Sequence, residues 1–168
     1  MTHPLTSYPP VVYDVEGGEV SAWIRPQDAV PELVYPNGVR VHYLAQGSST
    51  NGEFGLYRWE FSAARSGPDP HFHRTITESF YILSGSIAIF DGRAWRDTQP
   101  GDFAVVPQGG IHGFRNESGE PGSMLLLFTP GAPREEYFET LATLAEHPMT
   151  PTERAAFMDR HDNHWVEG

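Results

Sequence analysis

The chain has 168 residues and a formal net charge of −11, with 22 acidic residues against 11 arginines and neither lysine nor cysteine. This length allows one domain with a sizeable core but not two barrels, and a negative charge without a basic cluster argues against nucleic acid and anionic membranes as partners. The missing residue types exclude a disulfide framework, a thiol nucleophile and a lysine Schiff base.

The chain divides into three parts. The first two differ in whether apolar and polar residues alternate along the sequence. Residues 1–36 are rich in proline, and we expect an extended arm with one short strand over residues 11–15. Residues 37–130 hold short alternating segments separated by turn signals such as Asn37-Gly38 and Asp91-Gly92. We expect strands over residues 39–45, 54–62, 79–83, 87–90, 94–97, 103–106, 112–115 and 124–128. Many short strands at this spacing predict one antiparallel sandwich or barrel.

The third part, residues 131–168, has helical periodicity. Its first apolar face is formed by Tyr137, Leu141, Leu144 and Ala145, at i, i+4, i+7 and i+8. A second helix begins after Thr150, which is followed by proline and, three residues on, by Glu153 in a capping box. We expect both helices to pack on the outside of the barrel or near its mouth, and His161 and His164 to lie in an exposed tail.

Residues 67–116 contain two groups of potential metal ligands. The first group reads G-P-D-P-H-F-H-R-T-I-T-E-S-F-Y-I-L-S-G and holds His71, His73 and Glu78. The second reads G-D-F-A-V-V-P-Q-G-G-I-H-G-F-R-N and holds His112. Residues i and i+2 of a strand point to the same face, roughly 7 Å apart, so one strand can present two imidazoles to one cavity.

Three imidazoles and one carboxylate suit a single first-row divalent ion: Mn, Fe, Co, Ni, Cu or Zn. A closed structural zinc site would more often recruit cysteines. The alternative interpretation is that the histidines merely pack in the core.

Strand alternation predicts an aromatic cavity around these ligands. In the segment 54–62, one face carries Tyr57, Trp59 and Phe61, and the other face carries polar residues, which belong outside. We expect the substrate pocket to be lined by Tyr43, Tyr57, Trp59, Phe61, Phe80, Phe114 and Phe128. Such a mostly apolar cavity with one polar centre is typical of a small-molecule site. The alternative is that these aromatic residues fill the barrel core.

Both ligand motifs resemble the signature motifs of the cupin superfamily, H-x-H-x4-E-x6-G and G-x5-P-x-G-x2-H-x3-N. Only the leading glycine of the first motif is displaced, by two residues to Gly67. The segments N-G-V-R-V-H-Y-L-A-Q-G and L-Y-R-W-E-F are similar to those of bacterial quercetin 2,3-dioxygenase-like monocupins. The resemblance implies an all-β cupin barrel, a double-stranded β-helix or jelly roll, over residues 37–130.

The same resemblance implies a metal-dependent dioxygenase that uses O2 on an aromatic, polyphenol-like compound. His71, His73 and His112 would hold the ion, and Glu78 would be both a ligand and the acceptor of the substrate hydroxyl proton. Two alternatives remain open: a metal-dependent isomerase or decarboxylase without O2, and a cupin that binds a small molecule without catalysis.

Two further expectations concern assembly and location. Small barrels leave sheet edges and an apolar outer face, so we expect a homodimer in which the arm crosses between subunits. The N-terminus lacks a basic segment followed by an apolar one, and no apolar run approaches about 18 residues. We therefore expect a soluble cytoplasmic protein.

Overall fold

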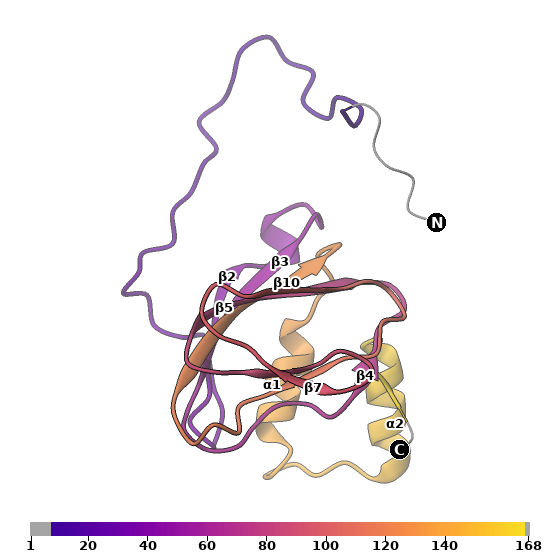
Figure 1. Ribbon diagram of the computed structural model, residues 1–168. Helices are drawn as coiled ribbons and strands as arrows, with labels where there is room; N and C mark the ends of the chain where they lie inside the picture. The colour runs from indigo at the N-terminus through magenta and orange to yellow at the C-terminus, as the bar shows by residue number, and fades with distance from the viewer. Residues whose placement is uncertain (1–7, 167–168) are drawn as a thin grey trace.

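A computed structural model describes residues 8–166 of the chain (Figure 1). Its main sheet has six strands in the order β1-β2-β3-β10-β5-β8, and all of the pairs are antiparallel. These strands are β1 (Leu33–Val34), β2 (Arg40–Ala45), β3 (Gly55–Phe61), β10 (Gly122–Thr129), β5 (Thr77–Ser84) and β8 (Phe103–Val106). The strands expected over the other five segments are confirmed, within a few residues at each end, whereas β1 was not expected and lies in the segment assigned to the arm.

Two smaller sheets complete the β structure. One joins β7 (Trp95–Asp97), β6 (Ala88–Phe90) and β9 (Gly113–Arg115), and the other pairs β11 (His164–Trp165) with β4 (His71–Phe72). The core lies between the sheets, as Trp59 of β3 meets Phe114 of β9 at a centroid distance of 6.1 Å. The fold is therefore an antiparallel β sandwich, as expected.

The side-chain alternation that predicted this core is present in the main sheet. In β3 and β10 every second residue is buried, and the residues between them are only half-buried. The two strands pair in register, with Met124 opposite Trp59 and Leu126 opposite Tyr57. Burying one face of each strand fixes this register, because a slip of one residue would turn the apolar side chains outwards.

Two helices cover one end of the sandwich (Figure 1). Helix α1 (Glu135–Thr143) is tied to the main sheet by tyrosine hydroxyls: Tyr35 donates to the carbonyl of Phe138 at 2.9 Å, and Tyr43 to Glu139 at 3.1 Å. Helix α2 (Pro151–Arg160) begins with the expected capping box at Thr150. It packs on α1 through stacked rings of Tyr137 and Phe157, whose centroids lie 5.6 Å apart.

The N-terminal arm swings away from the sandwich (Figure 1). The strand expected over residues 11–15 is wrong, because residues 8–32 form no strand, and the arm pairs with the sheet only through β1 at its end. Val11, Val12 and Val20 are exposed there. Arg25 connects the arm to β2, since its Nε donates a hydrogen bond to the carbonyl of Tyr43 at 3.2 Å.

The expectation of an exposed C-terminal tail is also wrong. His161 is buried, and His164 belongs to β11, which pairs with β4. Asp162, with φ of 54°, makes the left-handed turn that brings the chain from α2 back to the sandwich. The first helix ends at Thr143, so Ala145 lies beyond it. Within residues 8–166, neither helix is long and apolar enough to cross a membrane.

Candidate metal centre and cavity

The four potential ligands converge in the interior. His71 lies in β4, Glu78 in β5, and His73 and His112 directly beside β4 and β9. None of the four is more than 3% exposed. One nitrogen or carboxylate oxygen from each side chain lies within 4.8 Å of those of the other three. Residues 41 positions apart in sequence thus present their donor atoms to one point, because β4 and β9 are joined by the bridge between His71 and His112.

Backbone carbonyls fix the orientation of all three imidazole rings. Nδ1 of His71 bonds the carbonyl of Asp69 at 2.8 Å, and Nδ1 of His112 bonds that of Gly110 at 2.9 Å. Nδ1 of His73 bonds the carbonyl of Asp162 at 2.6 Å. A carbonyl oxygen only accepts, so each Nδ1 carries the proton. This leaves Nε2 as the atom of each ring that can bind a metal.

Glu78 connects two of these rings. Its Oε2 lies 2.8 Å from Nε2 of His112 and 3.0 Å from Nε2 of His73. Burial would raise the pKa of Glu78, but the bonds from His112 and His73 outweigh burial and hold this pKa well below its usual range. Burial would likewise lower the pKa of His112, but its bond to Glu78 outweighs that effect and raises it. The contact between Glu78 and His112 thus shifts the pKa values of the two side chains in opposite directions.

His71 behaves differently. Burial and the neighbouring His112 lower the pKa of His71 to about 3, so this ring is neutral at neutral pH. A neutral imidazole is the form that binds a metal. The donor set, its burial and the carbonyl bonds at every Nδ1 fit a first-row divalent ion.

The displaced glycine of the first motif has a steric reason. Gly67 has φ of +138°, and a Cβ at this position would lie 1.9 Å from the carbonyl oxygen of Phe114. Only glycine allows this close approach. The contact holds the loop before His71 against β9, next to the bridge between Ser66 and Asn116.

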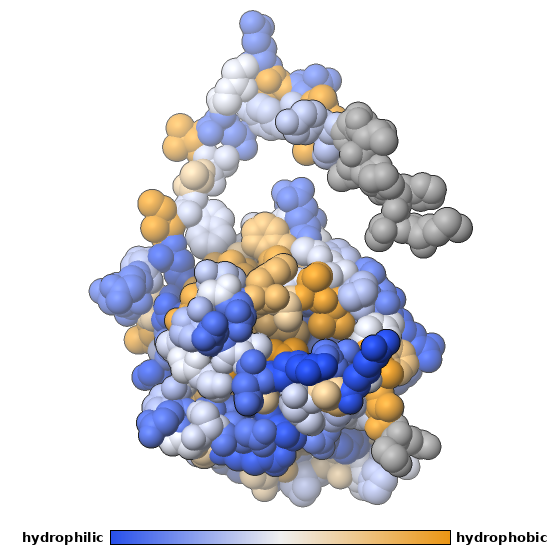
Figure 2. Space-filling model, viewed as in Figure 1, coloured by the Kyte–Doolittle hydropathy of each residue, from blue (hydrophilic) through white to orange (hydrophobic). Residues whose placement is uncertain are grey.

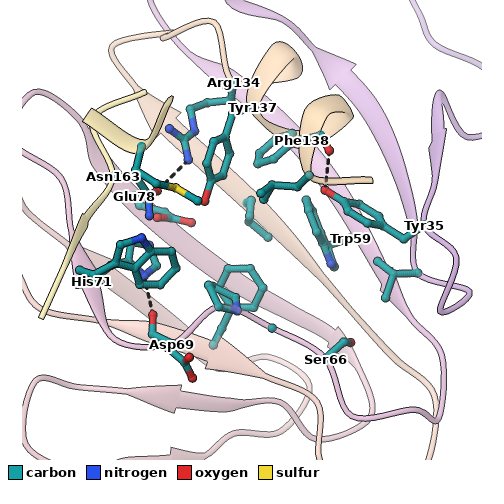
Figure 3. Close-up of a pocket in the computed structure, with 18 of the residues that line it drawn as sticks. Tyr35, Trp59, Ser66, Asp69, His71, Glu78, Arg134, Tyr137, Phe138 and Asn163 are labelled. Carbon is teal, nitrogen blue, oxygen red and sulfur yellow. Dashed lines mark hydrogen bonds between the residues drawn. The ribbon is translucent and has the colours of Figure 1, made fainter. Parts of the chain in front are cut away.

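A cavity of about 300 Å³ opens onto the cluster, and His71 and Glu78 line it (Figure 3). Of the expected pocket residues, Trp59, Phe114 and Phe128 line this cavity. The other four, Tyr43, Tyr57, Phe61 and Phe80, are buried in the core.

Sequence reasoning missed the cavity residues that come from outside the sandwich. The helices and the C-terminal segment contribute Arg134, Tyr137, Phe138, Leu141, Arg154, Met158, Asn163 and Trp165. The capping box and the apolar spacing predict where the helices lie in the sequence. These signals do not indicate which helix residues face a cavity. The helices therefore form part of the wall and do not merely pack outside.

Tyr137 and Arg134 lie on the same side of the cavity as Glu78 (Figure 3). The guanidinium carbon of Arg134 lies 4.3 Å from the centroid of the Tyr137 ring. Burial raises the pKa of Tyr137, Arg134 opposes this rise, and Glu78 adds to it. Tyr137 therefore keeps its hydroxyl proton at neutral pH, and the hydroxyl is directed towards Glu78 (Figure 3).

Comparison with known proteins gives one family and several relatives. Residues 57–128 match the family model of the cupin domain. Quercetin 2,3-dioxygenase of Bacillus subtilis (strain 168) is 33% identical over 120 residues, or 71% of this chain and 35% of that protein. The chain thus spans about a third of the length of this curated relative.

Solved structures share the fold. A predicted oxalate decarboxylase from Thermotoga maritima aligns with a TM-score of 0.58 and 18% identity, over 65% of this chain and 99% of that one. KdgF from Halomonas sp. aligns with a TM-score of 0.56 and 20% identity, over 66% of this chain and 94% of that one. At these identities, the likeness concerns the fold alone.

Proposed function

Because the chain belongs to the cupin superfamily and has its all-β fold, we propose that it is a metal-dependent dioxygenase acting on a hydroxylated aromatic compound of the polyphenol, quercetin-like kind. One observation carries the proposal: an aromatic-walled cavity opens onto three imidazole nitrogens and one carboxylate. The similarity to quercetin 2,3-dioxygenase supports the choice of reaction and substrate class.

His71, His73, Glu78 and His112 would hold one divalent ion. When bound, such an ion supplies redox chemistry towards O2 and a positive charge that favours ionisation of a substrate hydroxyl. Burial of all four side chains in the sandwich keeps bulk water from competing for these positions.

Glu78 would accept the proton of that hydroxyl. Its pKa lies well below the usual range, because the bonds from His112 and His73 outweigh burial, so the side chain is ionised at neutral pH. Among residues 8–166, hydrogen bonds reach only its Oε2, which leaves Oε1 for a substrate. A general base must lie within about 2.6–3.2 Å of the group that it deprotonates. Because Glu78 lines the cavity, a substrate hydroxyl bound beside it would lie within this distance.

The cavity walls would orient a flat substrate. Trp59, Phe114 and Phe128 supply ring faces and edges for an aromatic body. Tyr137, protonated at neutral pH, can donate a hydrogen bond to a substrate oxygen near Glu78. The volume of about 300 Å³ lies at the lower end of small-molecule sites.

A second candidate function is a metal-dependent decarboxylase or isomerase of a carboxylic acid. The specific observation in its favour is the buried guanidinium of Arg134 in the cavity wall, which suits a carboxylate. The same four ligands serve either reaction. A third outcome, binding without turnover, would make the protein a small-molecule carrier or sensor.

Oxygen uptake separates these functions. We expect the metal-reconstituted protein to consume O2 in proportion to substrate loss, with at least one member of a panel of flavonols and catechols. Substrate loss under argon would indicate the isomerase or decarboxylase, and release of CO2 would identify the latter. Binding of every panel member without loss of any would contradict an enzymatic role towards these compounds.

A further inference from the structure

Arg134 is a buried cation with neutral partners. It stands at the start of α1 and is 4% exposed. Its Nη1 donates to the carbonyl of His161 at 2.6 Å, and its Nη2 donates to Oδ1 of Asn163 at 3.3 Å. Aromatic rings surround the rest of the group, with those of Tyr137 and Phe128 at 4.3 and 5.3 Å.

The charge of Arg134 has no counter-ion of its own. Within the described part of the chain, it forms no ion pair, and its Nε is buried without a hydrogen-bond partner. Burying an unpaired charge costs several kcal/mol, so arginines in protein interiors normally meet a carboxylate. Two carboxylates line the cavity. Asp69 is exposed, and Glu78 is buried with its Oε2 already in contact with His112 and His73.

A second donor without a partner lies beside it. Asn163 is 3% exposed and lines the same cavity, and its Oδ1 is used by Arg134 while its Nδ2 is buried without a partner. Arg154 adds another guanidinium at the exposed rim. Two buried donor groups side by side in an apolar wall complement an acceptor that carries negative charge.

We propose that Arg134 and Asn163 form an anion-binding subsite, and that the cavity's ligand is an aromatic acid whose carboxylate occupies this subsite. The aromatic body would lie between Trp59, Phe114 and Phe128, with its other end towards Glu78 and His71. The inference rests on the proposed function only in taking this cavity as the substrate site. It narrows the substrate class from any hydroxylated aromatic to one with a fixed negative charge.

Binding of two matched probes tests the subsite. 2-Naphthoate and 2-naphthamide have the same ring system and differ in charge, and binding of either can be followed by the fluorescence of Trp59 and Trp165 in the cavity wall. The full-length protein is titrated both as purified and after chelation, so that binding of the carboxylate to a metal is measured separately. We expect 2-naphthoate to bind at least about tenfold more tightly in both forms.

Three variants assign this preference to a residue. Arg134→Gln keeps hydrogen-bond donors but removes the charge, so the preference should fall to about twofold or less, whereas Arg134→Lys should keep most of it. Arg160→Gln is the matched control, because Arg160 is exposed on α2 and pairs with Glu136 outside the cavity. An unchanged preference in Arg134→Gln, or none in the wild type, would overturn the proposal.

Arg134 also holds the C-terminal segment, so the glutamine variant requires a check of folding. If it does not fold, the wild-type preference and Arg154→Gln decide instead. If Arg154→Gln still prefers 2-naphthoate to 2-naphthamide, the result supports Arg134 as the anion-binding residue. If the preference disappears, the anion binds Arg154 at the rim and the proposal is overturned. If 2-naphthoate is preferred but no O2 is consumed, the oxygenase function is wrong and the subsite stands. If neutral flavonols are oxidised but 2-naphthoate is not preferred, the subsite is wrong and the oxygenase function stands.

Discussion

Nδ1 of His73 donates a hydrogen bond of 2.6 Å to the backbone carbonyl of Asp162, 89 residues further along the chain. The carboxylate of Asp162 in turn accepts bonds from the backbone NH groups of Arg74 at 2.9 Å and Thr75 at 2.8 Å. Asp162, two residues beyond the end of α2, thus fixes one of the four candidate ligands and the turn that follows it. Part of the site therefore lies outside residues 57–128, which match the cupin family.

Asp162→Ala should weaken metal binding without removing a ligand. Asp162 adopts φ of 54°, which alanine accommodates poorly, and the variant also loses the bonds to Arg74 and Thr75. We expect the affinity for zinc to fall roughly tenfold in competition with a chromophoric chelator. Asp162→Asn, which tolerates this φ and keeps an oxygen acceptor, should lose less.

The control for this experiment is Asp159→Ala, at an exposed position of α2. It should bind zinc like the wild type. If Asp162→Ala also retains wild-type affinity, the C-terminal segment does not position His73.

The stability of the metal-free protein should fall as the pH is lowered from about 6.5 to about 5. Burial and then His112 lower the pKa of His71 from 6.5 to about 3, so between these pH values the unfolded chain binds more protons than the folded one. Over that interval, the free energy of unfolding should fall by about 2 kcal/mol on account of this residue.

Urea denaturation of wild-type protein and His71→Gln measures this contribution, which the variant lacks. His112 acts in a separate window: its bond to Glu78 raises its pKa against the effect of burial, so its contribution is full below pH 6.5 and is lost as the pH rises above that value. Equal slopes for wild type and His71→Gln below pH 6.5 would refute the burial of a neutral His71.

The sequence predicted features that are set over short distances. The capping box at Thr150 is local and lies at the expected helix start, and Glu78 lies in β5, which covers the strand expected over residues 79–83. One strand does not hold both His71 and His73, because β4 ends at Phe72, although the two side chains do meet. Alternation also identified the buried face of β3, because that strand is long enough to show a period.

Features that depend on long-range contacts could not be predicted. Strands β4 and β11 have two residues each, too few for any alternation, and the pairing of His164 with Phe72 exists only in the folded chain. Residues 11–15 have the composition of a strand, with three valines and a tyrosine, but have no partner strand within the described chain. In the sequence, nothing distinguishes Arg134 from any other residue at the start of a helix. It is buried in the folded chain, where it bonds the carbonyl of His161 at the end of α2.

Glu78 variants separate metal binding from proton transfer. Glu78→Asp withdraws the carboxylate by one methylene, about 1.5 Å. It should keep part of its metal and lose most turnover, because the oxygen no longer reaches the substrate hydroxyl. Glu78→Gln keeps a neutral oxygen ligand and lacks the base. If the glutamine variant, with metal bound, oxidises its substrate at the wild-type rate, Glu78 is not the proton acceptor.

We expect a homodimer that depends on the N-terminal arm. Apolar side chains lie along the arm, and an apolar patch is exposed on the body (Figure 2). β8 is an edge strand of the main sheet, and its Phe103 and Val105 are 64% and 59% exposed. Pairing with a second copy would cover such an edge.

Sedimentation tests this assembly. The full chain should have twice the monomer mass at micromolar concentration, and a chain lacking residues 1–22, which keeps the Arg25 contact, should shift towards monomer. A wild-type protein that remains a monomer at these concentrations would contradict the prediction.

The metal content of His112→Ala tests whether the four buried side chains together hold one divalent ion. Wild-type protein and His147→Ala, which lacks an exposed histidine outside the cluster, are reconstituted alongside it with the same divalent ion and analysed for bound metal. We expect about one ion per chain for the wild type and His147→Ala, and less than about a tenth of that for His112→Ala. Full occupancy in His112→Ala would show that His71, His73, Glu78 and His112 do not together hold the ion.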